Sequence, residues 1–277
     1  MFKQLVVLFI CAALSKNNVA APIKLNAFKE YNKARVDTLK VLTYNVHHCN
    51  PPGKNLIDVS AIVNVVKQSN ASIVALQEID VNTSRSGKDL DQAEAIAKAC
   101  GMYFCFGKAL DFAGGGYGVA ILSKYPISDV QTLLLPKDVD PKAEQRVLLT
   151  ARLTIGNNKY IRFASTHLDV VNESNREQQV NVIIKKMATD SLPFIIGGDF
   201  NATPKSNSIK LLDKAFQRSC TECTPTIPQD TPTDAIDFIA FDKRVAKKIK
   251  IVKHFVITET YASDHRPVYA ELLIKNL

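Results

Sequence analysis

The feature that most constrains the fold is a succession of short apolar segments from residue 38 to the C-terminus. Several are rich in β-branched residues and are bounded by Gly, Pro, Asn or Asp, which is typical of β-strands separated by turns. Gly156–Asn158 predicts a hairpin turn between two of them. The predicted strands are Thr38–Asn45, Ser72–Gln77, Met102–Phe106, Tyr117–Ser123, Ser128–Leu135, Arg146–Thr154, Lys159–His167, Phe194–Gly197, Ala235–Phe241, Lys250–Ile257 and Pro267–Ile274.

Three segments predict helices, because their apolar residues recur at helical spacing. The first follows a cap at Asp58 or Ser60, the second is Asp89–Ala99 and ends at Gly101, and the third is Ser174–Met187. Many strands and few helices predict an α+β fold. We expect a two-layered β-sandwich of mostly antiparallel sheets, flanked by helices that cover the outer faces.

The N-terminus has a different composition. Lys3 precedes the apolar run Leu5–Leu14, and Val19–Ala21 follows a short polar stretch, which is the layout of a secretory signal peptide. An uncleaved interfacial anchor or a buried strand is the alternative for this run. We expect residues 1–21 to be a signal peptide, 22–37 a linker and 38–277 one domain, in a protein exported to the periplasm or secreted.

The chain carries a net charge of +8. A basic protein attracts polyanions such as nucleic acid, anionic lipid headgroups or phosphorylated metabolites. The alternative is that this modest positive charge serves only to keep the protein soluble. The densest basic run, Lys243–Lys250, is expected on a turn and strand edge and is too sparse for a nucleic-acid patch. Cys220 and Cys223 could close a small disulfide loop, whereas a zinc site would need a second pair of ligands nearby.

Polar residues follow apolar strands at several points. Burying carboxylates at such strand ends costs free energy unless they are paired or bind a cation. We therefore expect a shared polar floor at one edge of the sandwich, and its oxygen-rich composition suits Mg²⁺ better than Zn²⁺. The residues concerned are Asn45, Glu78, His167, Asp199, Asn201, Asp237, Asp264 and His265.

Six segments resemble, in order, the successive motifs of the endonuclease/exonuclease/phosphatase family. That family includes DNase I-like nucleases, neutral sphingomyelinases and inositol polyphosphate phosphatases. Any one motif is weak, but six in order are specific and cover nearly all of residues 38–274. The resemblance implies a DNase I-like, four-layer α/β/β/α fold. The segments are Leu42–Asn45, Val74–Glu78, Ser165–Leu168, Gly197–Asn201, Ile236–Ile239 and Ser263–Val268.

The resemblance also implies roles for the polar residues. Asp199 would orient or deprotonate the attacking water, His265 would face the phosphate, and Asp237 would orient His265. His167 and Asn201 would contact phosphoryl oxygens. The alternatives are an Asx-turn after the strand before Asp199, a strand-end turn residue at Asn45, and ordinary core histidines. The implied metal ligands are Glu78, which would end its strand, Asn45 and Asp264.

Other residues could line the same cleft. Arg146 could clamp phosphate with two hydrogen bonds, although a surface arginine is an equal alternative. Near the loop after Glu78, the residues that could reach the substrate are Asn82, Arg85 and Gln92. His47 and His48 directly follow Asn45; such a pair is more often one wall residue and one solvated residue than a second metal site.

The resemblance implies a hydrolase of phosphate esters that uses Mg²⁺, with Mn²⁺ as a substitute. The first reading is a phosphodiesterase on nucleic acid or a phospholipid headgroup. The alternative is a phosphomonoesterase on sugar, inositol or nucleotide phosphates. A catalytically silent binding module would have lost a metal-binding or water-activating residue, and none is lost. Loops 107–116 and 202–206 are short, which disfavours a grip on duplex DNA. We expect a monomer without an obligate protein partner.

Overall fold

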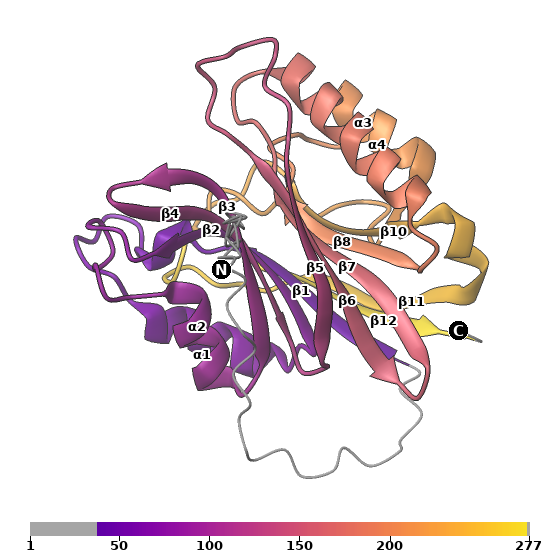
Figure 1. Ribbon diagram of the computed structural model, residues 1–277, viewed down its shortest axis with the longest axis horizontal. Helices are drawn as coiled ribbons and strands as arrows, with labels where there is room; N and C mark the ends of the chain where they lie inside the picture. Colours follow the sequence, from indigo (N-terminus) through magenta and orange to yellow (C-terminus); the bar gives the residue numbers. More distant parts are fainter. Residues whose placement is uncertain (1–37, 276–277) are drawn as a thin grey trace, which may run out of the picture.

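Two β-sheets pack face to face at the centre of the protein (Figure 1). The computed structural model describes residues 38–275. The predicted signal peptide and linker, residues 1–37, lie outside the described residues. None of the described helices is long and apolar enough to cross a membrane.

Each sheet has six strands. In spatial order the first sheet contains β11 (Ile249–Val256), β12 (Val268–Ile274), β1 (Thr38–Asn45), β2 (Ile73–Val81), β4 (Gly115–Ser123) and β3 (Tyr103–Phe112). The second contains β5 (Ile127–Leu134), β6 (Val147–Gly156), β7 (Lys159–His167), β8 (Phe194–Asp199), β10 (Asp237–Asp242) and β9 (Phe216–Arg218). The pairs β1/β2 and β7/β8 are parallel, and the other described pairs are antiparallel. The predicted fold class is confirmed.

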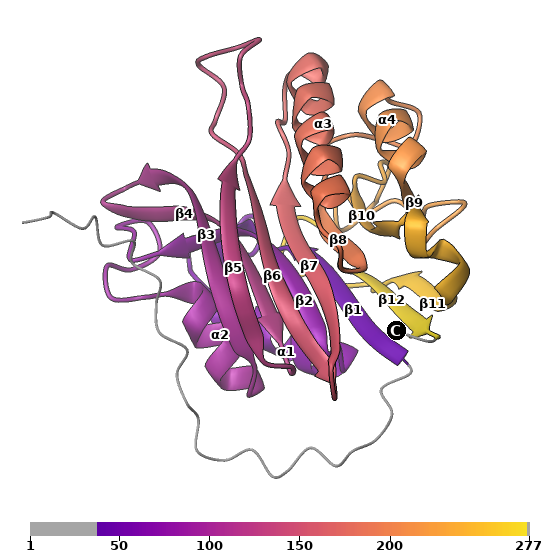
Figure 2. The same cartoon turned by 45° about the vertical axis from the view of Figure 1, so that its right-hand side comes forward.

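Helices cover both outer faces of the sandwich (Figure 2). Helices α1 and α2 pack on the first sheet, and α3 and α4 pack on the second. Each parallel strand pair is joined through one of these helices, α1 between β1 and β2 and α3 between β7 and β8. The layers are therefore α/β/β/α. The described helices are α1 (Val59–Ser69), α2 (Gln92–Cys100), α3 (Glu173–Thr189) and α4 (Asn207–Ala215), with 3-10 turns η1 (His47–Cys49) and η2 (Lys243–Lys248).

The main apolar core lies between the sheets, where Ile73, Ile121 and Phe163 are fully buried. The sheets approach closely at Gly197 on β8. A Cβ added there would lie 3.0 Å from the Cβ atoms of Thr43 and Ala75 on the facing sheet. A side chain at this point would force Thr43 or Ala75 to shift by a few tenths of an ångström, so glycine allows the two layers to approach closely two residues before Asp199.

Several element boundaries differ from those predicted. Asp58 caps α1 as expected, but α2 starts later, with Asp91 rather than Asp89 as its cap. The segment 107–116 is a hairpin of β3 and β4 rather than a loop, because polar residues occupy the solvent side of β3. Residues 243–248 form a 3-10 turn before β11, and neither α4 nor β9 was predicted. Cys220 and Cys223 form a disulfide.

Candidate active site

The strand register brings three predicted site residues together on the second sheet. His167 and Asp199 are the last residues of the parallel strands β7 and β8, and they lie opposite each other. On the other side of β8, Asp237 at the start of β10 also lies opposite Asp199. Directly opposed residues point to the same face of a sheet, so the three side chains are neighbours. This pairing forms one half of the polar floor.

The first sheet supplies the other half. Asn45 is the last residue of β1 and pairs with Gln77 on β2, directly before Glu78. Glu78 does not end its strand as predicted, because β2 continues to Val81 through a bulge between Leu76 and Ile79. Glu78 itself has a φ of 58°. A bulge re-aims one side chain without ending the pairing, and here it turns the carboxylate towards the cavity.

A cavity of about 420 Å³ opens over these strand ends. Asn45, Asp237, Asn82 and Gln92 are not among its lining residues. The residues that line it are His47, His48, Glu78, Arg85, Phe112, Tyr117, Glu144, Arg146, His167, Val170, Asp199, Asn201, Ile227, Asp264 and His265. Most of the predicted site residues therefore share one cavity, although they come from both sheets.

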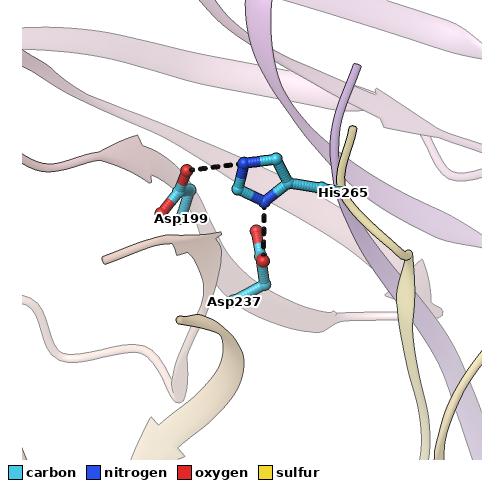
Figure 3. Close-up of side chains that lie close together, drawn as sticks. All are labelled: Asp199, Asp237 and His265. Atoms are coloured by element: carbon cyan, nitrogen blue, oxygen red, sulfur yellow. Dashed lines mark hydrogen bonds and ion pairs between the residues drawn. The ribbon is translucent and has the colours of Figure 1, made fainter. Parts of the chain in front are cut away.

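His265 lies between two carboxylates (Figure 3). Its Nδ1 donates to Asp237 Oδ2 at 2.9 Å, and its Nε2 lies 3.7 Å from Asp199 Oδ2. Burial lowers the pKa of His265, but the charges of Asp237 and Asp199 outweigh burial and raise it to about 10. Burial and the Asp237 carboxylate raise the pKa of Asp199. The arrangement is a buried imidazolium held between two acids.

His167 is neutral, in contrast to the protonated His265. Arg146 Nη1 donates to His167 Nδ1 at 3.2 Å, so the proton of the neutral ring sits on Nε2. This Nε2 lies 3.5 Å from Asp199 Oδ2. Burial and the Arg146 charge hold the pKa of His167 well below its usual value. His167 is therefore a neutral donor aimed into the cavity.

Asn45 connects the two sheets behind the cavity. Its Nδ2 donates to Glu78 Oε1 at 3.1 Å and to Asp199 Oδ2 at 3.0 Å. Its Oδ1 accepts from the backbone N–H of His47 at 3.1 Å. Asn45 thus fixes the spacing between Glu78 and Asp199.

Two further carboxylates at this cavity could hold a divalent cation. Glu78 and Asp264 both line the cavity, and Asn45 Oδ1 keeps a second lone pair. Burial raises the pKa of Glu78, but His48, His167 and Asn45 outweigh burial and hold that pKa well below its usual range. A charged, partly buried carboxylate next to amide and carboxylate oxygens is a normal ligand set for such an ion. Donor atoms of Asp199, Asp237 and His265 also lie within 4.8 Å of one another, and within this group His265 Nδ1 donates to Asp237 Oδ2 at 2.9 Å while Asp237 Oδ1 has no partner among the described residues.

Of the remaining predicted residues, two line the cavity and two do not. Asn201 lines the cavity, and its Nδ2 donates to Leu168 O at 3.0 Å. Arg85 also lines it, hydrogen-bonded to Asp80 and stacked over Phe112. Asn82 is exposed and turns the chain after β2. Gln92 is fully buried at the start of α2, so the expectation that it lines the cleft is wrong: its amide binds backbone atoms.

Five cavity residues were not predicted. Phe112 and Tyr117 come from the β3/β4 hairpin, whose glycine-rich turn was the available signal. Glu144 lies on the loop before β6, which extends beyond the sheets in Figure 2, and Nη1 of Arg146 contacts it at 2.6 Å. Val170 and Ile227 complete the wall. Apolar loop residues such as these have no recognisable pattern in one sequence.

Comparison with known proteins agrees with this geometry. The model of the endonuclease/exonuclease/phosphatase family matches residues 42–265. The chain therefore belongs to this family, whose members hydrolyse phosphate esters.

Individual relatives cover almost the same region. The uncharacterized protein YbhP of Escherichia coli (strain K12) is 26% identical over 250 residues, which is 85% of this chain and 96% of YbhP. An endonuclease/exonuclease/phosphatase structure from Beutenbergia cavernae has a TM-score of 0.72 at 18% identity, covering 87% of this chain and 72% of that one. The mannosyl-6-phosphatase of Bacteroides thetaiotaomicron has a TM-score of 0.68 at 20% identity, with coverages of 85% and 100%. These structural similarities establish the DNase I-like fold.

Proposed function

We propose that this protein is a divalent-metal-dependent phosphodiesterase that hydrolyses its substrate by in-line attack of water. The observation that carries the proposal is the position of Asp199. Its Oδ2 lies within 3.0–3.7 Å of Asn45, His167 and His265, at the floor of a cavity that also contains Glu78. One carboxylate surrounded by donors is suited to hold and deprotonate a water molecule.

The protonation of the surrounding groups supports this role. Asp199 has a raised pKa, which makes it a stronger base for water than an exposed aspartate. His265 carries a positive charge held by Asp237, and His167 is a neutral Nε2–H donor. These two donors face the position of the phosphoryl oxygens, where preorganised donors contribute most in the transition state.

The metal would be held by Glu78 and Asp264, with Asn45 keeping Glu78 in place. When bound, a divalent cation supplies Lewis-acid polarisation of a phosphoryl oxygen and stabilises charge on the leaving oxygen. From these oxygen ligands alone Mg²⁺ is the expected ion, with Mn²⁺ as a substitute.

The charge of the cavity favours a diester over a monoester. A phosphomonoester carries close to two negative charges at neutral pH, whereas a diester carries one. Both arginines that line the cavity are already paired, Arg146 with Glu144 and Arg85 with Asp80. The second ester group of a diester would also find apolar walls at Phe112 and Val170.

A phosphomonoesterase is the second candidate. The observation that favours it is the similarity to the mannosyl-6-phosphatase structure, which covers 85% of this chain. Export through residues 1–21 to the periplasm or the exterior, and a monomeric state without an obligate partner, remain proposals from the sequence.

A substrate panel tests the proposal. The metal-free protein is assayed with bis-p-nitrophenyl phosphate and p-nitrophenyl phosphate, with chelator or with added Mg²⁺ or Mn²⁺. We expect no turnover with chelator, restoration by the metal, and a kcat/KM at least about tenfold higher for the diester. A preference for the monoester would identify a phosphomonoesterase instead. Plasmid, single-stranded oligonucleotide, sphingomyelin and inositol phosphates then define the natural substrate class, and no turnover of any of these substrates would contradict the proposal.

A further inference from the structure

The turn that follows β1 has an unusual backbone. His47, His48 and Cys49 have φ values of 46°, 42° and 58°, so three successive residues other than glycine are left-handed. Such a conformation persists only where the surrounding structure imposes it, and it is concentrated at functional sites. The turn carries both imidazoles to the wall of the cavity.

Hydrogen bonds to neighbouring segments hold this turn. Gln92 Nε2 donates to His48 O at 2.7 Å, and Gln92 Oε1 accepts from the backbone N–H of Asp80 at 2.9 Å. Asp80 lies two residues after Glu78, just beyond the β2 bulge. One buried amide therefore fixes the distance between the backbone of His48 and the strand of Glu78.

The two histidines of the turn are in different states. The Nδ1 of His47 donates to the carbonyl oxygen of Asn50 at 2.8 Å. The Nδ1 of His48 is buried and has no hydrogen-bond partner within residues 38–275. It faces Glu78 Oε2 at 3.9 Å, which is beyond hydrogen-bond distance. A buried nitrogen without a partner, facing a carboxylate, requires an explanation.

A cation between the two atoms would satisfy both. Two donor atoms that bind one ion at about 2.1 Å are at most about 4.2 Å apart. The separation of 3.9 Å between His48 Nδ1 and Glu78 Oε2 lies within this limit. A direct hydrogen bond would instead draw them to about 2.8 Å.

We propose that His48 Nδ1 is a ligand, together with Glu78, of the divalent cation in this cavity, and that the site therefore prefers a first-row transition-metal ion to Mg²⁺. Imidazole nitrogen is a good ligand for such ions, whereas Mg²⁺ requires oxygen ligands in near-ideal octahedral geometry. The inference deepens the proposed function, because the ion would be its cofactor. It replaces the expectation that one histidine of the pair is merely solvated.

Pulsed electron paramagnetic resonance of the full chain loaded with Mn²⁺ tests the ligand directly. An imidazole bound to Mn²⁺ produces a ¹⁴N modulation of the spin echo. We expect this modulation in the wild type and its loss in His48→Asn, since Asn tolerates a left-handed backbone. The matched controls are His47→Asn, in the same turn, and His254→Gln, on β11 and hydrogen-bonded to Ser219. Both should keep the modulation.

Metal titration gives a second readout. His48→Asn should weaken Zn²⁺ binding at least about tenfold and Mg²⁺ binding by less than about threefold, because an imidazole nitrogen is a good ligand for Zn²⁺ and a poor one for Mg²⁺. Absence of ¹⁴N modulation in the wild type, or its persistence in His48→Asn, would overturn the proposal. If His48→Asn does not fold, His48→Gln takes its place, and the ¹⁴N modulation must again be lost. No readout uses a substrate, so the result is independent of whether the enzyme is a phosphodiesterase.

Discussion

At the scale of single residues, Arg146 lines the cavity and contacts His167. Its Nη1 contacts both Glu144 Oε1 at 2.6 Å and His167 Nδ1 at 3.2 Å. Its Nε is buried and has no partner among the described residues. A guanidinium carries five N–H donors in a rigid planar fork, whereas an ammonium has three rotatable donors on one nitrogen and cannot reproduce this geometry.

We therefore predict that Arg146→Lys lowers kcat/KM for bis-p-nitrophenyl phosphate by about 10- to 100-fold, since it removes a fixed donor and the partner of His167 Nδ1. Arg152→Lys is the matched control, because Arg152 is exposed on the same strand. Steady-state kinetics and thermal unfolding of both variants provide the comparison. Equal kinetics for Arg146→Lys and the wild type would remove Arg146 from the site.

The identities of the central residues could be predicted from the sequence. Asp199 and His167 each follow an apolar strand, so their burial in a shared polar cluster was expected. Their hydrogen-bond partners could not be predicted. The bridge from Asn45 to both Glu78 and Asp199 depends on how the sheets face each other, and no local pattern encodes that contact.

At the scale of elements, Asp169 organises the loop between β7 and α3, which presents Val170 to the cavity. Its Oδ1 accepts from the backbone N–H groups of Val171 at 2.8 Å and Asn172 at 2.7 Å, and its Oδ2 accepts from Asn175. Burial raises the pKa of Asp169, but these donors outweigh burial and hold it below the usual value. The carboxylate therefore stabilises the folded loop only while it is ionised.

We predict that Asp169→Asn lowers the free energy of unfolding by about 1–3 kcal/mol at neutral pH. Because the pKa is lower in the folded state, this stabilisation is present above the unfolded pKa of about 3.9 and is lost as the pH falls through the folded pKa. The difference between wild type and variant should be constant above about pH 5 and shrink below about pH 4. Urea unfolding across this range measures it, and a difference that grows in acid would refute the assignment.

Regular elements could largely be predicted, but irregular ones could not. The strands follow from β-branched apolar runs, and Gly101 marks the end of α2. The bulge at Glu78 and the left-handed turn at His47 and His48 contain no glycine, so local preference argues against them. Their conformations are imposed by tertiary contacts, and both lie at the cavity.

At the scale of the whole molecule, the site exists because the two sheets meet at a fixed distance. Gly197→Val should lower the free energy of unfolding by about 1–3 kcal/mol, because its side chain must enter the contact with Thr43 and Ala75. Gly156→Val is the control: its Cβ meets only the Lys159 side chain, at 3.7 Å or more. Denaturant unfolding compares them, and equal stability of the two variants would contradict this account of the interface.

The central claim is that Asp199 from β8 and His265 from the segment before β12 act as one catalytic unit. The measurement that tests it most directly is kcat for Asp199→Asn, His265→Gln and the double variant, with folding checked by circular dichroism. Each single change should lower kcat at least about a hundredfold. The kcat of the double variant should be no more than about tenfold below that of the less active single variant. Losses that multiply in the double variant, or turnover that survives either change, would contradict the account.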